Sequence, residues 1–132
     1  MSTSRDYTGG CHCGAVRFIA RLPEVIPYLI DCNCSICVKK GIVHCPVERE
    51  DFCLERGEGS LRLYQFHSRA ARHWFCGHCG IHVYGVPRNA PERLTVNARC
   101  LDDFEAIRAR ARLRTFDGRN HPRDASGDDG GI

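Results

Sequence analysis

The chain alternates short runs of hydrophobic and β-branched residues with turns rich in glycine and proline. Runs of this length and composition are typical of β-strands, whereas long segments with a helical period are missing from the pattern. We therefore predict an all-β domain of short antiparallel strands with little helix. The strands are expected at residues 15–22, 28–31, 42–47, 51–56, 61–66, 72–75, 81–86, 93–98 and 113–116.

Two segments have helical character, and one pair of strands has the pattern of a hairpin. Ser35–Lys40 is predicted to form one helical turn that ends at Gly41, and the longest helical period runs from about residue 102 to 110. The strictly alternating segment 61–66 is predicted to pair with 51–56 across the glycine-containing turn between them.

The length of 132 residues, 42% of them hydrophobic and 27% charged, suits one domain with an ordinary core. We predict a flexible N-terminus at residues 1–8, a domain at 9–122, and a disordered polar and glycine-rich tail at 123–132. No apolar run reaches the ~18 residues of a membrane span, and the first residues lack the pattern of a secretory signal. We therefore expect a cytoplasmic protein without a membrane partner.

Charge gives little support for a polyanionic partner. The net charge is +3, and the 19 basic and 16 acidic residues are mostly interleaved. The basic run Arg108–Arg114 follows Asp102, Asp103 and Glu105, so we predict a solvated face there rather than a phosphate-binding surface. Nucleic acid is therefore not an expected partner.

Seven of the ten cysteines occur in closely spaced groups. Cys-x-Cys and Cys-x-x-Cys spacing in a chain without a secretory signal favours metal-bound thiolates over disulfides. The other three, Cys45, Cys53 and Cys100, stand alone in apolar or alternating stretches and are predicted to be small buried hydrophobic residues. The seven grouped cysteines are Cys11, Cys13, Cys32, Cys34, Cys37, Cys76 and Cys79.

Four of these cysteines have the pattern of a closed structural zinc site. Cys11 and Cys13 form one pair, and Cys76 and Cys79 form a second pair far along the chain. Together they supply the four thiolates of a tetrahedral zinc site. The segment 76–79 is predicted to be a zinc knuckle that joins two strands.

The remaining three, Cys32, Cys34 and Cys37, are one ligand short of a closed site. Either a protein side chain such as Cys45, His44 or another histidine completes the shell, or water or substrate holds the fourth place. We favour the open site. Three thiolates leave a zinc complex at a charge of −1, which makes the ion a weak Lewis acid and hydrolysis a poor fit. An incoming thiol fits better, because zinc favours soft sulfur and deprotonates it.

The cysteine motifs resemble those of a known family. The segments Gly9–Val16, Cys32–Cys37, Phe75–Gly80 and Phe116–Pro122 resemble, in the same order, the glutathione-dependent formaldehyde-activating enzyme family, which is related to the centromere protein V domain. The resemblance implies an Mss4-like all-β fold and a reaction in which glutathione adds to formaldehyde to give S-(hydroxymethyl)glutathione. It also implies a structural zinc ion on Cys11, Cys13, Cys76 and Cys79 and a catalytic zinc ion on Cys32, Cys34 and Cys37.

We therefore expect a zinc-dependent carbon–sulfur lyase, resembling S-(hydroxymethyl)glutathione synthase, that adds a small thiol such as glutathione to a small aldehyde. The alternative is a non-catalytic, zinc-stabilised binding module in which both metals are structural. A fourth position left open by the protein at the second metal favours the enzyme. Candidates for holding an anionic thiol are Lys39, Lys40, Arg69 and Arg72, with Trp74 or His73 lining the pocket.

Overall fold

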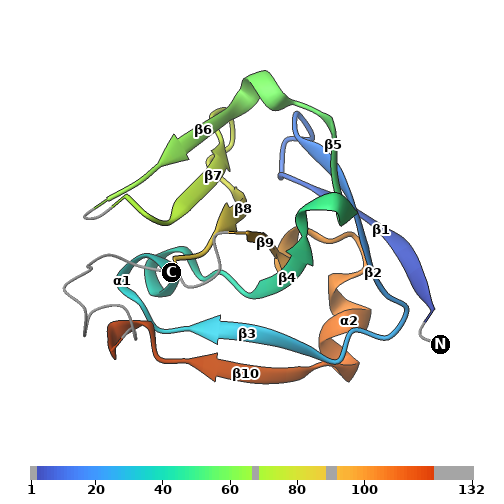
Figure 1. The fold of residues 1–132 in the computed structure, drawn as a ribbon. Helices are drawn as coiled ribbons and strands as arrows, with labels where there is room; N and C mark the ends of the chain where they lie inside the picture. The colour runs from blue at the N-terminus through green and yellow to red at the C-terminus, as the bar shows by residue number, and fades with distance from the viewer. Residues whose placement is uncertain (1–2, 67–68, 89–91, 121–132) are drawn as a thin grey trace.

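The computed structural model describes residues 3–66, 69–88 and 92–120 and contains two β-sheets (Figure 1). The smaller sheet has three antiparallel strands in the order β1-β2-β5. These are β1 (Ser4–Gly10), β2 (Arg17–Pro23) and β5 (Phe52–Arg56).

The larger sheet has seven strands in the order β10-β3-β4-β9-β8-β7-β6. The pair β10 and β3 is parallel, and the other pairs are antiparallel. The strands are β3 (Tyr28–Cys32), β4 (His44–Glu48), β6 (Leu61–Tyr64), β7 (Arg72–Cys76), β8 (His82–Val86), β9 (Arg93–Asn97) and β10 (Arg112–Phe116).

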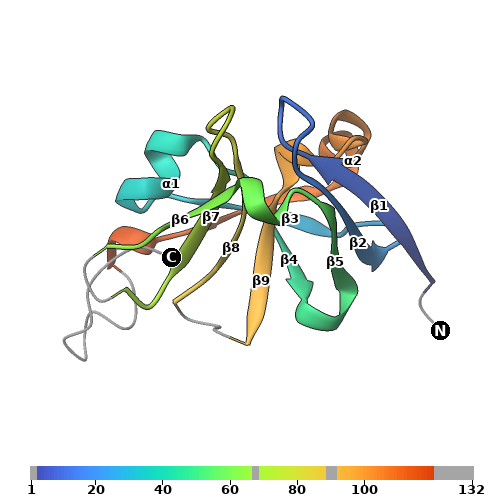
Figure 2. The ribbon, with the colours of Figure 1, turned by 90° about the horizontal axis from the view of Figure 1, so that it is seen from above.

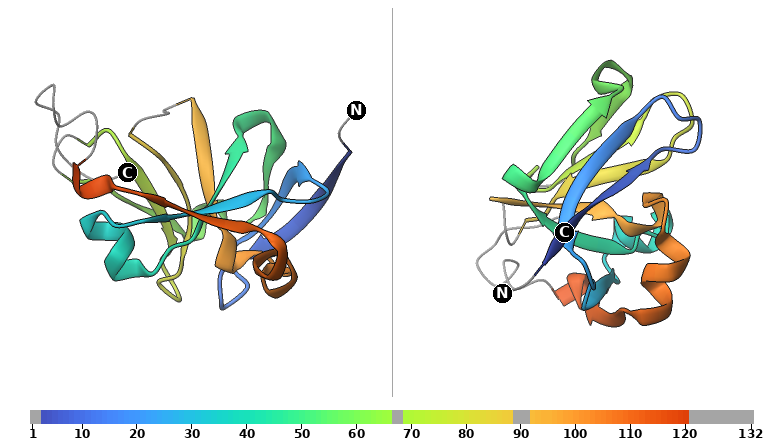
Figure 3. Two further views of the ribbon diagram at one scale, coloured as in Figure 1. Left: turned by 90° about the horizontal axis from the view of Figure 1, so that it is seen from below. Right: turned by 90° about the vertical axis from the view of Figure 1, so that its right-hand side faces the viewer.

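Two short α-helices, α1 (Ser35–Lys40) and α2 (Phe104–Arg110), lie at opposite ends of the β3–β10 pair (Figures 1 and 3). Helix α1 ends at Gly41, whose φ of 68° is left-handed and whose N–H bonds to the carbonyl oxygen of Cys37, as the sequence predicts. The predicted all-β class with little helix is confirmed. None of the helices in the described ranges is long and apolar enough to cross a bilayer.

Buried side chains form two separate hydrophobic clusters. The main core gathers residues of both sheets around Val16, Phe18, Val83 and Val96, each of which is completely buried. The second cluster is small and consists of Cys32, Cys34, Cys37 and Ile42, with Ile36 and Phe116 packed against it. The three-cysteine segment therefore has its own local packing.

The predicted flexible N-terminus is wrong from Ser4 onward. Strand β1 pairs with β2 along its whole length, and its Tyr7 is buried in the main core. Arg5 also forms an ion pair with Asp103. The alternation of outward and inward residues in this segment is what supports the strand. Residues 1–2 and the predicted tail 123–132 lie outside the described residues.

The predicted hairpin between 51–56 and 61–66 is also wrong. Strand β5 pairs with β2 in the small sheet, and β6 pairs with β7 in the large sheet. Gly57, with a φ of 92°, begins the connection between the sheets, and a Cβ there would lie 2.2 Å from the carbonyl oxygen of Ala15. Alternation alone does not say which strand is the partner, because several alternating strands compete for each edge.

The isolated cysteines divide into two buried and one exposed. Cys45 and Cys100 are buried as predicted, and burial raises the pKa of each thiol to about 12. Cys53 is exposed, contrary to prediction. It lies on the edge strand β5, where its neighbours Phe52 and Leu54 take the inward positions and Cys53 faces out.

Candidate metal centres

The four-cysteine group lies where the two sheets meet. Cys11 and Cys13 lie in the turn between β1 and β2, Cys76 ends β7, and Cys79 lies in the turn to β8. Figure 2 shows these two hairpin turns side by side. A metal ion bound to all four would therefore connect the small sheet to the large one.

The sulfur positions fit a tetrahedral metal. All four Sγ atoms lie within 4.8 Å of one another, with Cys13 Sγ 3.6 Å from Cys11 Sγ and 3.7 Å from Cys76 Sγ. Zinc–sulfur bonds of about 2.3 Å in a tetrahedron place sulfurs about 3.8 Å apart. Backbone amides of Val16 and His78 donate to Cys11 Sγ at 3.3 Å and to Cys76 Sγ at 3.4 Å. This group could hold a metal ion.

Neighbouring amides also favour thiolate formation in this group. Burial opposes ionisation of Cys79, but the backbone amides of Cys13 and Ile81 and the nearby sulfurs lower its pKa to about 6. The amide of Ala15 favours the Cys13 thiolate, yet burial and the sulfurs of Cys11 and its neighbours raise the pKa of Cys13 to about 11. One thiol of the group thus ionises readily, and another needs the charge of a cation to do so.

The three-cysteine group lies at the join between β3 and α1. Cys32 is the last residue of β3, Cys34 is the residue at the start of α1, and Cys37 lies within the helix. Their Sγ atoms also lie within 4.8 Å of one another. All three side chains are buried, with exposed fractions of 1%, 2% and 1%. The backbone N–H of Cys34 donates to Cys32 Sγ at 3.4 Å. These three sulfurs could hold a metal ion.

Crowding of sulfurs favours the protonated forms of Cys32 and Cys37 in the absence of a cation. The Cys34 sulfur raises the pKa of Cys32 to about 11. The sulfurs of Cys32 and Cys34, together with burial, raise the pKa of Cys37 far above its usual range. A bound divalent cation reverses this effect, because its charge stabilises the thiolates. Metal binding here must therefore release protons.

The described residues supply no fourth ligand to this group. Among residues 3–66, 69–88 and 92–120, no further cysteine, histidine or carboxylate has a ligand atom within 4.8 Å of all three sulfurs. Cys45 belongs to the main core, and Cys100 Sγ donates to the carbonyl oxygen of His82 at 3.4 Å. His44 has its Nε2 3.1 Å from Cys37 Sγ but has no nitrogen within 4.8 Å of all three sulfurs. Among the described residues, the three sulfurs therefore converge without a fourth protein ligand.

The segment that follows β10 holds the loop between Cys32 and Cys34. The backbone N–H of Asn33 donates to the Phe116 carbonyl oxygen at 3.2 Å, and its side-chain amide donates to Asp117 at 3.1 Å. Arg119 donates from its backbone N–H to Asn33 Oδ1 at 3.1 Å and from Nε to the Asn33 carbonyl oxygen at 2.8 Å. The sequence shows this segment only as part of a family motif, without a role for its residues.

Gly118 makes the closest approach to the sulfurs from this segment. A Cβ at Gly118 would lie 2.6 Å from Cβ of Cys34 and 2.7 Å from Sγ of Cys32. Real Cβ atoms do not come so near, so any side chain here would move the cysteine loop or the segment itself. The absence of a side chain at this position allows the segment to cover one side of the three-cysteine group.

A layer of buried polar side chains lies beside the group. Lys40, half-buried at the end of α1, has its Nζ 3.3 Å from Nδ1 of His82, whose ring centroid lies 5.9 Å from that of His73. Burial lowers the pKa of His73 to about 4, of His82 to about 2 and of His44 to about 4.

Burial also lowers the pKa of Lys40, while the charge of Cys37 opposes that change. Among the basic candidates, Lys40 is therefore the one coupled electrostatically to the cysteine group, whereas Lys39, Arg69 and Arg72 are exposed.

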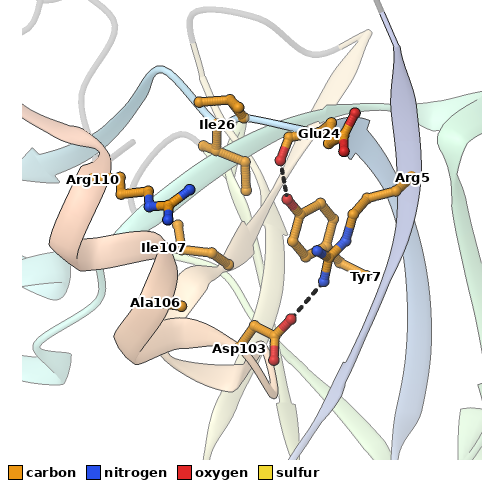
Figure 4. A pocket seen from close by; sticks show the side chains of 9 residues that line it. Arg5, Tyr7, Glu24, Ile26, Asp103, Ala106, Ile107 and Arg110 are labelled. Atoms are coloured by element: carbon orange, nitrogen blue, oxygen red, sulfur yellow. Dashed lines mark hydrogen bonds and ion pairs between the residues drawn. The ribbon is translucent and has the colours of Figure 1, made fainter.

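A surface pocket of about 200 Å³ lies elsewhere, between β1 and α2 (Figure 4). Arg5 and Asp103 form an ion pair at 2.5 Å on its wall, and the Tyr7 hydroxyl donates to the carbonyl oxygen of Glu24 at 2.8 Å. No cysteine of either group lines this pocket. We therefore do not assign this pocket to thiol chemistry.

Comparison with known proteins agrees with the cysteine geometry. The model of the family described as glutathione-dependent formaldehyde-activating enzyme matches residues 6–117. The chain belongs to this family. A crystal structure of a Rhodobacter sphaeroides protein, solved as a structural-genomics target, has a TM-score of 0.68 and 38% sequence identity. That similarity covers 72% of this chain and 87% of the Rhodobacter chain. Both findings confirm the family resemblance seen in the motifs.

Proposed function

We propose that this chain is a zinc-dependent carbon–sulfur lyase that joins a small thiol, glutathione or a similar compound, to a small aldehyde such as formaldehyde. One observation carries the proposal: three converging thiols, Cys32, Cys34 and Cys37, lack a fourth ligand among the described residues. Family membership supports the same chemistry. The proposed reaction resembles that of S-(hydroxymethyl)glutathione synthase.

The two cysteine groups have different proposed tasks. Cys11, Cys13, Cys76 and Cys79 would hold a structural zinc ion, since four sulfurs close the shell. Cys32, Cys34 and Cys37 would hold a catalytic zinc ion. When bound there, zinc lowers the pKa of a thiol at the fourth position and keeps the sulfur nucleophilic, because the three thiolates already supply electron density.

The bond changes in this reaction are simple. The sulfur of the substrate thiol gives up its proton and forms a bond to the carbonyl carbon of the aldehyde. The π bond of the carbonyl group breaks towards oxygen, which takes up one proton to become a hydroxyl. No electrons are gained or lost overall, so the addition needs no oxidant or reductant.

The chain's own residues contribute binding and exclusion of water. The buried surroundings of the three sulfurs, including Ile42 and Phe116, keep bulk water away and strengthen electrostatic interactions there. Lys40, coupled to Cys37 and half-buried, is placed to attract the carboxylate of an anionic thiol. The proposed site therefore combines a soft metal position with one nearby positive charge.

The alternative is a zinc-stabilised binding module in which both metals are structural. It would require a fourth protein ligand at the three-cysteine group. The basic segment that such a module could use, Arg108–Arg114, gives it little support, because Arg114 stacks over Tyr28 with its guanidinium carbon 4.1 Å from the ring centroid. We therefore prefer the enzyme, and we retain the expectation of a cytoplasmic location that its thiolate-rich composition suggests.

The test is the rate at which glutathione and formaldehyde interconvert with their adduct. Magnetisation-exchange NMR measures this rate at equilibrium, where the uncatalysed reaction serves as the baseline. We expect the wild-type chain with two zinc ions to raise the exchange rate, Cys37→Ala to return it to the baseline, and the exposed Cys53→Ala to leave it raised. A wild-type rate equal to the baseline with both glutathione and smaller thiols would contradict the proposal.

A further inference from the structure

His44 makes a polar contact with the three-cysteine group from within the sheet. It is the first residue of β4 and is 3% exposed. Its Nε2 lies 3.1 Å from Sγ of Cys37, and its Nδ1 lies 3.0 Å from Oγ1 of Thr95 on β9. Both ring nitrogens therefore have a partner, and the imidazole is held between a metal-ligand candidate and a hydroxyl group.

The sheet register explains how this contact arises. His44 pairs with Asn97 of β9, so Thr95 lies two residues along on the same face, diagonal to His44. Thr95 pairs on its other side with Gly85 of β8, which has no side chain to compete for the space. The backbone therefore places the imidazole and the hydroxyl together, and α1 brings Cys37 to the other end of the ring.

The geometry distinguishes His44 from a fourth metal ligand. Ligand atoms of one tetrahedral zinc site lie less than about 4 Å apart, given metal–ligand bonds of about 2.0–2.3 Å. His44 has no nitrogen within 4.8 Å of all three sulfurs, although it lies close to Cys37. A thiolate bound to a metal has no proton, so in the contact with Cys37 the imidazole must be the donor.

We propose that His44 is a positioning residue of the three-cysteine centre, donating a hydrogen bond from Nε2–H to the Cys37 thiolate while the Thr95 hydroxyl donates to Nδ1. The inference rests on the proposed function only in that these three sulfurs hold a metal ion. The Cys37 thiolate fixes the tautomer, because it can only accept, so a neutral imidazole must carry its proton at Nε2. The Thr95 hydroxyl can then donate to Nδ1.

This hydrogen bond has two physical consequences. It fixes the orientation of the Cys37 side chain, so the three sulfurs converge before a metal arrives. It also withdraws electron density from one of the three thiolates. This matters because their combined negative charge exceeds the charge of a divalent ion by one. Loss of such an outer-shell partner typically weakens metal affinity about 10- to 100-fold.

The test compares His44 variants of the full chain in which the four-cysteine group already holds a zinc ion. His44→Phe keeps a ring of similar size but removes the donor, so the affinity for the second zinc ion should fall about 10- to 100-fold. His44→Gln can place an amide N–H near the position of Nε2 and should recover most of that affinity. Thr95→Val should lower it less than His44→Phe does. Competition with a chelator of known zinc affinity measures each value.

A spectroscopic readout separates this role from general damage to the core. With cobalt in the second site, loss of the hydrogen bond should move the sulfur-to-cobalt charge-transfer band to longer wavelength in His44→Phe but not in His44→Gln. The control is Cys45→Ala, the next residue of β4, which is equally buried but belongs to the main core and should leave both the band and the second-metal affinity unchanged.

Three outcomes would overturn the inference, and they are distinguishable. An unchanged zinc affinity and an unchanged charge-transfer band in His44→Phe would show that His44 does not position Cys37, while leaving the proposed function intact. Imidazole scattering at the second metal in the X-ray absorption spectrum of the wild type would make His44 a ligand instead. A wild-type chain that binds one ion only would remove the proposed catalytic centre and this inference together.

Discussion

The two cysteine groups differ most in what they connect. The four-cysteine group joins the β1–β2 turn to the β7–β8 turn, and Cys11 and Cys76 belong to the main core. The three-cysteine group spans six residues and belongs to a separate small cluster with Ile42. A metal on the first group closes a long loop, whereas a metal on the second closes a short one. The first should therefore govern folding and the second reactivity.

The group with the proposed catalytic role is the more buried of the two. In the four-cysteine group Cys13 is exposed and Cys79 is partly exposed, while the three-cysteine sulfurs are at most 2% exposed. The proposed reactive centre is therefore the less accessible of the two groups, and the proposal rests on the number of converging sulfurs instead. On the proposed function, a substrate thiol would reach the three-cysteine group only after the side chains that cover it move.

The largest expected effect comes from breaking the long-range group. Cys11→Ser and Cys76→Ser should each abolish folding, because structural zinc contributes about 10–16 kcal/mol of apparent binding free energy. That is as much as the entire stability of a small domain, about 5–15 kcal/mol. Circular dichroism and zinc analysis would measure the loss, with the exposed Cys53→Ser as the control. Either variant melting at the wild-type temperature would contradict the four-sulfur site.

A smaller effect on stability but a complete effect on chemistry is expected at the local group. Cys37→Ala should reduce the zinc content from two ions to one and abolish activity while the domain stays folded, since the main core does not include this cluster. Cys45→Ala is the matched control, because Cys45 is equally buried but belongs to the main core. Unfolding of Cys37→Ala would mean that the two groups share one structural role.

The cysteine groups could be predicted because metal ligands leave a local spacing signal. Cys32, Cys34 and Cys37 meet within one turn whatever the rest of the chain does, and Gly41 ends the helix by a property of its own backbone. Most strand positions were predictable for the same reason, since alternation is local, although β1 was predicted to be a flexible terminus. The all-β class follows from these local patterns.

Partners across long distances could not be predicted in this way. Alternation in β5 and β6 does not specify that they pair with β2 and β7 instead of each other. The contacts of Asn33 with Arg119 and of His44 with Thr95 also depend on sheet register. The chemistry of histidine could name His44 as a candidate ligand, but only the register shows that its Nε2 lies near Cys37 without reaching all three sulfurs.

An effect of intermediate size on zinc binding is expected from adding one methyl group beside the three-cysteine group. Gly118→Ala would place a Cβ 2.6 Å from Cβ of Cys34, so the cysteine loop must shift. We expect weaker binding of the second zinc ion and lower activity, with the first ion retained. Gly59→Ala is the control, since a Cβ there meets no atom within 4 Å. Chelator competition would show the difference, and equal zinc affinities would mean that the segment tolerates displacement.

The smallest expected effect concerns the dependence of stability on pH. It distinguishes proton uptake by the buried histidines on unfolding from competition between protons and metal for the sulfurs. Burial lowers the pKa of His73 from 6.5 to about 4, so the unfolded chain binds a proton in this range and the folded chain does not. Stability should therefore fall as pH drops from 6.5 towards 4. His73→Phe should flatten this slope by at most about 1.4 kcal/mol per pH unit.

Urea unfolding between pH 7 and 5.5 in excess zinc would measure that slope. A His73→Phe variant with the same pH dependence as the wild type would show that the loss of stability comes from the other buried histidines or from the sulfurs instead.

The most direct test of the central claim is X-ray absorption at the second metal, with zinc or cobalt in the three-cysteine site, before and after a small thiol is added. The account predicts three sulfurs and one lighter atom at first, and four sulfurs once the thiol is present. Four sulfurs before any thiol is added would mean that the protein closes the shell itself. That result would contradict the enzyme and favour the binding module.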